Sequence, residues 1–304
     1  MTPWRRIMTE AISKPSSSRS TPCFRAPARP PSASTQFVIT RDKLKVVFDA
    51  AIQGCREQTL KHITLPDGED FTLEFVTGKP WSAYNWYKGK YQSLIQINVE
   101  QPIYIERAID IGCHEGYPGH HTYNALLEKN LVVDRKWLEF SVYPLFSPQS
   151  LIAEGSANYG VEMAFPDALK RSFQRDVLYP LAGINPALLE KYEALLKLTG
   201  QLSFAGNEAA RNYLDGKASR AQTIDWLINV ELYPAEKAPQ RTTFFDTYRS
   251  YVINYNVGKD LVRDYVEANS RGGSGEPENT GLRWRVFEQL LSSPRLPSNI
   301  KAPH

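Results

Sequence analysis

Three of the five histidines in this 304-residue chain lie within eight residues of one another, on both sides of a Pro-Gly pair. They belong to the stretch HEGYPGHH, which runs from His114 to His121. Apolar residues at helical spacing between Ile105 and Gly112 predict a packed helix that leads into this stretch. Pro118 has no amide hydrogen and its ring crowds the carbonyl four residues earlier, so a regular helix has to open there. The fold must therefore contain a broken helix with imidazoles on both sides of the break.

A glutamate flanked by histidines is typical of hydrolytic zinc sites. In the common signature HExxH, one helical turn places both imidazoles on one face, and the glutamate between them serves as base. A straight helix would here turn His120 by about 600° from His114 and carry His121 near 10 Å away, too far for Zn–N bonds of about 2.0–2.1 Å. A bulge of two residues around Pro118 would return His120 to the required place, and a bulge of three would return His121. The spacing leaves both open.

The third zinc ligand is expected from a second helix, predicted over residues 148–164. Zinc hydrolases usually have three protein ligands and keep a fourth position for water. Glu154 lies in a run of small residues that lets another helix approach closely, and a carboxylate on such a face is costly unless it is paired or binds a metal. Glu162, two turns further along, is the competing candidate.

The histidine stretch and the segment AEGSANYG around Glu154 resemble the HExxPGHH and EGxxxY signatures of the domain-of-unknown-function 885 family of zinc peptidases. The resemblance implies a mainly helical α+β, zincin-like metallopeptidase domain. It also implies that His120 is a ligand together with His114, that Glu154 is the third ligand and that Glu115 is the general base. The similarity runs from about residue 72 to residue 300 and includes PWSAYNWYKG (80–89), SPQSLIAEG (147–155), YRSYVINYNVGK (248–259) and LLSSPRLPS (290–298).

Further residues have candidate roles around this centre. Tyr255 and Tyr251 are candidate donors to the oxyanion of the reaction, and the resemblance favours Tyr255. Arg249 or Lys259 could hold a substrate carboxylate, which would make the enzyme an exopeptidase. The remaining candidates act next to the ligands: Asp110, one turn before His114, to orient its imidazole, and His121 either to support a ligand from behind or to face the substrate.

The expected activity is hydrolysis of peptide bonds, with Zn²⁺ as cofactor and a peptide or small amide as substrate. The SAYNWY segment could supply a strand edge along which an extended peptide binds. One alternative is a metal-dependent hydrolase or lyase of a small non-peptide amide, and another is a zinc-stabilised, inactive binding protein. An intact Glu115 favours an enzyme, because a structural zinc site needs no base and is normally closed by four protein ligands.

Charge and composition restrict the expected binding partners and the expected cellular compartment. The sequence has 36 basic and 33 acidic residues, but six basic residues and one acid fall in residues 1–40, so the other 264 residues have 30 basic and 32 acidic side chains. We therefore expect no nucleic-acid partner, and the lack of a long apolar run predicts no membrane span. Three cysteines without a CxxC pair support neither a disulfide framework nor a thiolate zinc site, which favours a reducing cytosol and an inert, buried Cys113 thiol.

The sequence predicts a tail over residues 1–40 and one catalytic domain over residues 41–304. The tail is rich in Ser, Pro and Arg, which predicts disorder or, alternatively, an organellar transit peptide. Members of the family are often longer on the N-terminal side, so the domain has the length of a member truncated there. Hydropathy predicts antiparallel strands at 71–76, 83–87 and 93–99. It predicts helices at 42–59, 103–117, 120–129, 148–164, 186–199, 220–231, 241–268 and 282–292. Helix starts are expected at Ser147-Pro148 and at the capping box Ser219 to Gln222, and a loop is expected at 270–281.

Overall fold

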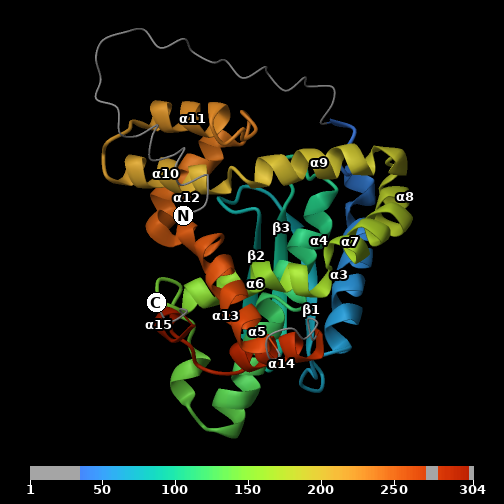
Figure 1. Cartoon of the computed structure of the whole chain (residues 1–304), viewed down its shortest axis with the longest axis vertical. Helices are drawn as coiled ribbons and strands as arrows, with labels where there is room; N and C mark the ends of the chain where they lie inside the picture. The colour runs from blue at the N-terminus through green and yellow to red at the C-terminus, as the bar shows by residue number, and fades with distance from the viewer. Residues whose placement is uncertain (1–34, 272–279, 301–304) are drawn as a thin grey trace. The chain divides into compact units, whose positions relative to one another are not determined.

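The protein is mainly helical, with one small sheet (Figure 1). The computed structural model describes residues 35–271 and 280–300, and these carry all of the structure reported below. The expected mainly helical α+β class is confirmed. Most of the loop expected at 270–281 lies outside the described residues, as does most of the expected tail.

The folded region begins earlier than residue 41. Phe37 and Ile39 are buried in the core, at 6% and 3% exposure, and Val38 forms an isolated antiparallel bridge with Tyr104. The expected tail boundary at residue 40 is therefore wrong by several residues, because apolar side chains at alternate positions form a short extended segment. The first long helix, α3 (Leu44–Leu60), follows directly after the short turn η1 (Arg41–Lys43).

The sheet consists of β1 (Asp70–Val76), β2 (Ala83–Gly89) and β3 (Gln92–Asn98), in the order β1-β3-β2. β2 and β3 pair antiparallel, but β1 and β3 pair parallel, so the expectation of a purely antiparallel region is wrong. Alternating hydropathy identifies strands but not their neighbours. β3 takes the central place because its buried side chains Ile95 and Ile97 belong to the core, and β2 is left at an edge.

Two central helices pack closely enough for their backbones to meet. These are α6 (Gln149–Ala164) and α13 (Val257–Ser270), which lie side by side in Figure 1. A Cβ added to Gly155 would lie 2.4 Å from the backbone of Gly258, so only glycine fits at this contact. The small-residue face predicted around Glu154 is thus used for a close helix contact.

The helix-start predictions have different outcomes. Ser219 accepts a hydrogen bond from the backbone of Gln222, whose side chain bonds back to Ser219, so the predicted capping box is confirmed. The predicted cap at Ser147 is wrong: α6 begins at Gln149, and the buried Ser147 hydroxyl has no hydrogen-bond partner. The Ser147 carbonyl accepts the first turn's N–H of Ser150 instead.

The long helix predicted over 241–268 is interrupted. α12 (Ala238–Tyr248) ends where Arg249 adopts a φ of 52°, and the 3₁₀ turn η7 (Arg249–Asn254) separates it from α13. Helices between residues 167 and 182 and between 203 and 214 were not predicted. The remaining elements are α4 (Glu106–Ile111), η2 (Gly112–Gly116), α5 (His120–Leu127), η3 (Glu128–Asp134), η4 (Leu138–Ser141), α7 (Asp167–Phe173), η5 (Gln174–Leu178), α8 (Tyr179–Ala182), η6 (Pro186–Leu188), α9 (Leu189–Gly200), α10 (Ser203–Leu214), α11 (Arg220–Asn229), α14 (Thr280–Leu291) and α15 (Pro297–Ile300).

A disulfide joins Cys55 on α3 to Cys113 in η2, with their Cα atoms 5.3 Å apart. The expectations that no disulfide is present and that Cys113 is a free thiol are therefore wrong. An odd number of cysteines does not reveal a pair that is 58 residues apart in sequence and meets only in the fold. Disulfides persist mainly in oxidising compartments, so the cysteines no longer favour a reducing cytosol.

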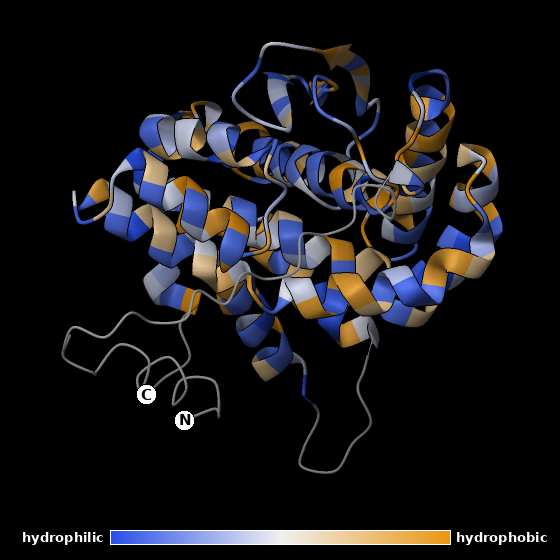
Figure 2. Cartoon of the chain, turned by 90° about the horizontal axis from the view of Figure 1, so that it is seen from above, coloured by the Kyte–Doolittle hydropathy of each residue, from blue (hydrophilic) through white to orange (hydrophobic). Residues whose placement is uncertain are grey.

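Hydrophobic and hydrophilic residues alternate along the helices, as the colouring in Figure 2 shows. Within residues 35–271 and 280–300, none of the helices has both the length and the apolar character needed to cross a bilayer.

Candidate metal centre

The HEGYPGHH stretch forms a bulged turn between two helices. α4 runs into the π-helical turn η2, and α5 then begins at His120. The amide of Gly119 donates to the carbonyl of Cys113 at 3.0 Å, and a Cβ on Gly119 would lie 1.8 Å from the carbonyl oxygen of His114. The helix opens at Pro118 as predicted, and the glycine lets the chain fold back against the turn that carries His114.

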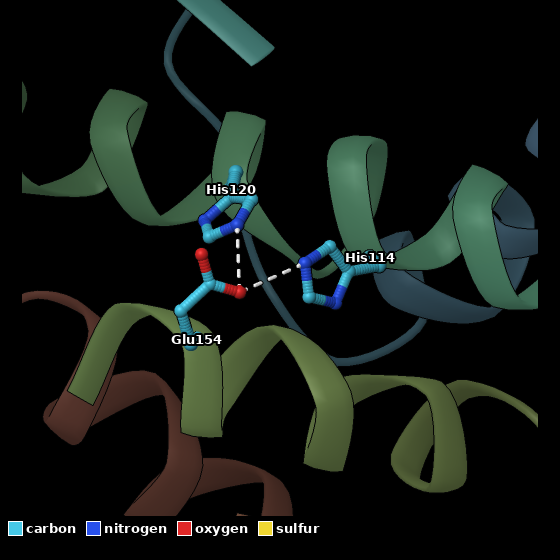
Figure 3. A group of neighbouring side chains, drawn as sticks. All are labelled: His114, His120 and Glu154. Atoms are coloured by element: carbon cyan, nitrogen blue, oxygen red, sulfur yellow. Dashed lines mark ion pairs between the residues drawn. The ribbon is translucent and has the colours of Figure 1, made fainter. Parts of the chain in front are cut away.

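This turn brings His114 and His120 together over Glu154 of α6 (Figure 3). Oε2 of Glu154 lies 3.1 Å from Nε2 of His114 and 3.6 Å from Nε2 of His120. The ligand atoms of the three residues all lie within 4.8 Å of one another. The sequence-predicted set of His114, His120 and Glu154 is thus brought together, and these residues could hold a metal ion.

The donor chemistry of the cluster fits a zinc ion. Oε2 of Glu154 is buried and has no hydrogen-bond partner, although it points at two imidazole nitrogens. An unpartnered buried carboxylate oxygen is costly, and a cation between the three side chains would satisfy it. Two imidazole nitrogens and one carboxylate oxygen are a donor set that catalytic zinc sites use.

The charges in the cluster are strongly coupled. Burial alone would raise the pKa of Glu154, but His120 and His114 outweigh it and hold that pKa well below its usual range. Burial likewise opposes the charged form of His120, and the carboxylates of Glu154 and Glu115 raise its pKa. The cluster therefore favours an ionised Glu154, which is the form that binds a metal.

Asn158 orients His114, a role that the sequence had suggested for Asp110. Nδ1 of His114 lies 2.9 Å from Oδ1 of Asn158, whose amide nitrogen donates to the carbonyl of Tyr255 at 2.8 Å. Because the amide is fixed in this way, Nδ1 carries the proton and the lone pair of Nε2 faces the cluster. The prediction for Asp110 is wrong: its carboxylate pairs with Lys170 at 2.8 Å, and the π-helical turn η2 between α4 and His114 changes the regular helical spacing.

His121 faces away from the cluster. Its side chain is 0% exposed, and its ring nitrogens lie 2.8 Å from Oγ of Ser93 and 2.9 Å from Oε2 of Glu69. Two adjacent residues on a helix point about 100° apart, so α5 can direct only one of them to the metal cluster. His121 therefore does not face the cluster, and of its two expected places the one behind the ligand His120 agrees with its contacts to Ser93 and Glu69.

Glu115 is buried beside the ligand His114, at 6% exposure. Burial raises the pKa of its carboxyl, and the nearby His114 and His120 offset this only in part. Its backbone carbonyl accepts a hydrogen bond of 2.8 Å from the side chain of Asn85 on β2, which ties η2 to the edge strand. The arrangement provides a carboxyl of raised proton affinity next to the cluster.

Two tyrosines from η7 and its end lie against the cluster. Tyr251 donates to Oε1 of Glu154 at 2.8 Å, and the ring of Tyr255 stacks over His114 with centroids 6.4 Å apart. Burial, followed by the charge of Glu154, raises the pKa of both phenols, so both remain protonated donors. Tyr251 thus positions a ligand, whereas the Tyr255 hydroxyl makes no hydrogen bond within the described residues.

The candidate carboxylate binders do not gather at the cluster. Lys259 pairs with Glu162, which is half-exposed and so is not the third ligand. Arg249 is exposed at the strained start of η7. The basic side chain that acts on Tyr255 is Arg241: its charge lowers the pKa of that phenol, against the larger effect of burial. Arg241 lies 5.1 Å above the ring of Phe244 and has a buried Nε without a hydrogen-bond partner.

Sequence reasoning missed Asn158 and Arg241, and it named Tyr84 only as part of the SAYNWY segment. Asn158 lies four residues after Glu154, so helical spacing in ANYG would have placed it near the ligand face. Burial raises the pKa of Tyr84 on β2, and the charges of Tyr248, Glu154 and Glu115 add to this effect. No sequence signal distinguished Arg241, the one basic residue of α12, from the other basic residues of the chain.

Comparison with known proteins supports the fold and gives no information on function. No family model matches the sequence, and no curated protein matches it. The structure is similar to one titled "The crystal structure of the putative lipoprotein from Colwellia psychrerythraea", with a TM-score of 0.61 and 13% sequence identity. The match covers 87% of this chain and 43% of that chain, so this chain spans less than half the length of that protein.

Proposed function

We propose that the protein is a zinc-dependent hydrolase that cleaves peptide bonds and belongs with the domain-of-unknown-function 885 peptidases. The observation that supports this is the convergence of two imidazole nitrogens on a buried, unpartnered oxygen of Glu154, next to the buried carboxyl of Glu115. A structural zinc site is normally closed by four protein ligands, whereas three ligands beside a free base are typical of a catalytic one.

The proposed roles follow from the chemistry of each group. His114, His120 and Glu154 would hold the zinc ion, which would supply Lewis acidity to the attacking water and to the scissile carbonyl. Glu115 accepts one proton of the attacking water as the new C–O bond forms, and it gives that proton to the nitrogen as the C–N bond breaks. Tyr255 donates its phenolic hydrogen to the oxyanion, which its free hydroxyl is suited to do.

The edge strand β2 supports a peptide as the substrate. β2 pairs only with β3 in the described sheet, so its other edge can accept an extended chain. Asn85 of this strand bonds to the Glu115 backbone and keeps a buried Oδ1 without a partner, which could accept an amide hydrogen. The rings of Tyr84 and Trp86, 4.5 Å apart, add an aromatic surface for apolar side chains.

Zinc content and peptide hydrolysis, measured on the same samples, test the proposal. We expect one zinc per chain in the wild type and cleavage products from a mixed peptide library by mass spectrometry. Glu115→Gln should keep zinc and lose hydrolysis, because it removes the base and spares the ligands. Glu154→Gln should lose both. The matched control is Glu162→Gln on the same helix, which should keep both.

Each result separates the proposal from its alternatives. A wild type without stoichiometric metal contradicts the zinc site. Zinc without peptide cleavage contradicts a peptidase, and a panel of small non-peptide amides then distinguishes another hydrolase from a binding protein. If Glu115→Gln retains the rate of the wild type, the assigned base is wrong.

Arg241 is proposed to bind the substrate's terminal carboxylate, in place of Arg249 or Lys259. The support is its unpartnered Nε and the action of its charge on Tyr255. Arg241→Met should slow cleavage of peptides with a free C-terminus more than cleavage of the same peptides with an amidated C-terminus. Equal slowing of both would contradict the role.

A further inference from the structure

A buried polar network lies behind the ligand turn, on the side away from the metal cluster. Its centre is Oε2 of Glu69, which accepts hydrogen bonds from the hydroxyl of Tyr117 at 2.6 Å and from Nε2 of His121 at 2.9 Å. These two donors stand on either side of Pro118, Gly119 and the ligand His120. One carboxylate oxygen therefore holds both ends of the segment that presents a ligand.

The rest of the network fixes this carboxylate in turn. Oε1 of Glu69 pairs with Arg56 of α3 at 2.7 Å, and the Arg56 guanidinium also lies 5.6 Å from the centre of the Tyr117 ring. Nδ1 of His121 lies 2.8 Å from Oγ of Ser93 on β3. With the Nε2 proton directed at Glu69, Nδ1 accepts from the serine hydroxyl, so both nitrogens are satisfied. The ligand turn is thus tied to α3, to β3 and to the residue that precedes β1.

Because the network is buried, its hydrogen bonds are not easily replaced by bonds to water. The side chains of His121 and Glu69 are 0% and 4% exposed, and Tyr117 is 2% exposed. In such surroundings a lost partner leaves donors that water cannot readily satisfy, so alternative orientations are costly. On the side of Arg56, the network borders a surface cavity of about 320 Å³, which is lined by Arg56, Glu69 and the loop between them. None of the three residues of the metal cluster lines this cavity.

The helix geometry connects this network to the metal. His120 and His121 are the first two residues of α5, and adjacent side chains on a helix keep a fixed angle of about 100°. A rotation of the first turn that moved His120 would also pull His121 away from Glu69. The bond between His121 and Glu69 therefore fixes the direction of His120.

We propose that Glu69 is a positioning residue: by binding Tyr117 and His121, it sets the place of His120 relative to His114 and Glu154. This inference rests on the proposed metal site. Glu69 touches neither the cluster nor the substrate groups assigned above, and it acts only through the turn. Groups behind a metal ligand typically change metal affinity about 10- to 100-fold.

Cobalt substitution tests the inference without relying on activity. The d–d absorption of bound Co²⁺ reports the geometry of its ligands, and a titration gives the dissociation constant. The variants are Glu69→Gln, which removes the charge, and Tyr117→Phe, which removes one of the two bonds and leaves Glu69 paired with Arg56 and His121. Glu74→Gln on β1 is the control, since Glu74 is exposed and bonds Gln96 outside the network.

We expect Glu69→Gln to weaken Co²⁺ binding about 10-fold or more and to change its spectrum, Tyr117→Phe to do so to a smaller extent, and Glu74→Gln to match the wild type. Circular dichroism checks that each variant is folded, and Tyr117→Phe decides the result if Glu69→Gln fails to fold. A wild-type spectrum and affinity in the folded variants would overturn the inference and leave the proposed function intact. A wild type that binds no Co²⁺ would overturn both.

Discussion

Tyr251 donates a hydrogen bond of 2.8 Å to Oε1, one of the two carboxylate oxygens of Glu154. The two oxygens of this carboxylate thus have different partners, since the phenol holds Oε1 while Oε2 is directed at His114 and His120. Because Tyr251 is buried at 7% exposure, the bond also fixes η7 against α6. A residue first considered as an oxyanion donor is therefore engaged with a ligand.

We expect Tyr251→Phe to weaken zinc binding about 10- to 100-fold, because the carboxylate loses the group that orients it. Competition with a chromophoric chelator measures the dissociation constant. Tyr248→Phe is the matched control, since the Tyr248 ring lies 6.0 Å from that of Tyr251 but makes no hydrogen bond to Glu154. An unchanged zinc affinity in Tyr251→Phe would show that the hydrogen bond does not position the ligand.

Tyr255→Phe should behave differently, because its hydroxyl is free to donate to the reaction's oxyanion. We expect zinc content to stay at the wild-type level while kcat falls about 10²- to 10³-fold, the usual effect of removing one oxyanion donor. Steady-state kinetics with a cleaved peptide, together with metal analysis, measure both quantities. Loss of zinc in this variant would assign Tyr255 to the metal site instead.

The approach of a second histidine to His114 was predictable because the signal for it is local. Pro118 requires the helix to break, and a bulge there was one of two ways to bring a second histidine back to His114. The choice of His120 over His121 depended on the partner of the second imidazole, Glu69, which lies 52 residues away in the chain. Local geometry left two candidate histidines, the family resemblance favoured His120, and the distant contact of His121 with Glu69 agrees with that choice.

Several predictions failed because they depended on the identity of a partner that is distant in the sequence. Asp110 lies one turn before His114, but its carboxylate forms an ion pair with Lys170 from α7. Alternation identified all three strands, yet the parallel pairing of β1 with β3 depends on how the sheet meets the core. The break at Arg249 also has no local signal, because a non-glycine residue at a φ of 52° is held there by its surroundings.

The contact between α6 and α13 predicts that Gly155→Ala destabilises the protein. The new Cβ would lie 2.4 Å from the backbone of Gly258, so the helices must separate, at a cost of about 1–3 kcal/mol. Urea unfolding measures the loss. In Gly200→Ala the added Cβ meets no atom within 4 Å, so this control should show a change near zero or a slight gain. Equal stability of the two variants would contradict the close contact.

The disulfide between Cys55 and Cys113 should stabilise the fold by closing a loop with a sequence separation of 58 residues. We expect the double variant Cys55→Ala, Cys113→Ala to lose about 2–4 kcal/mol of unfolding free energy. Dithiothreitol should lower the stability of the wild type and leave the double variant unchanged. If the reductant has no effect on the wild type, the bond is absent from the protein in solution.

The Glu69 network predicts a specific dependence of stability on pH. Burial opposes the ionised form of Glu69, but bonds from His121, Tyr117 and Arg56 outweigh it and lower the pKa below the ordinary value of 4.5. A carboxyl whose pKa is lower in the folded state stabilises the protein above the unfolded-state pKa, and this contribution is lost as pH falls through the folded-state value. Wild type should therefore exceed Glu69→Gln in unfolding free energy at pH 7, and the difference should shrink below about pH 4.5. Urea unfolding of both proteins in EDTA, which removes any contribution from metal release, measures this difference. If the difference in unfolding free energy does not change with pH, the charge of the Glu69 carboxylate does not stabilise the ligand turn.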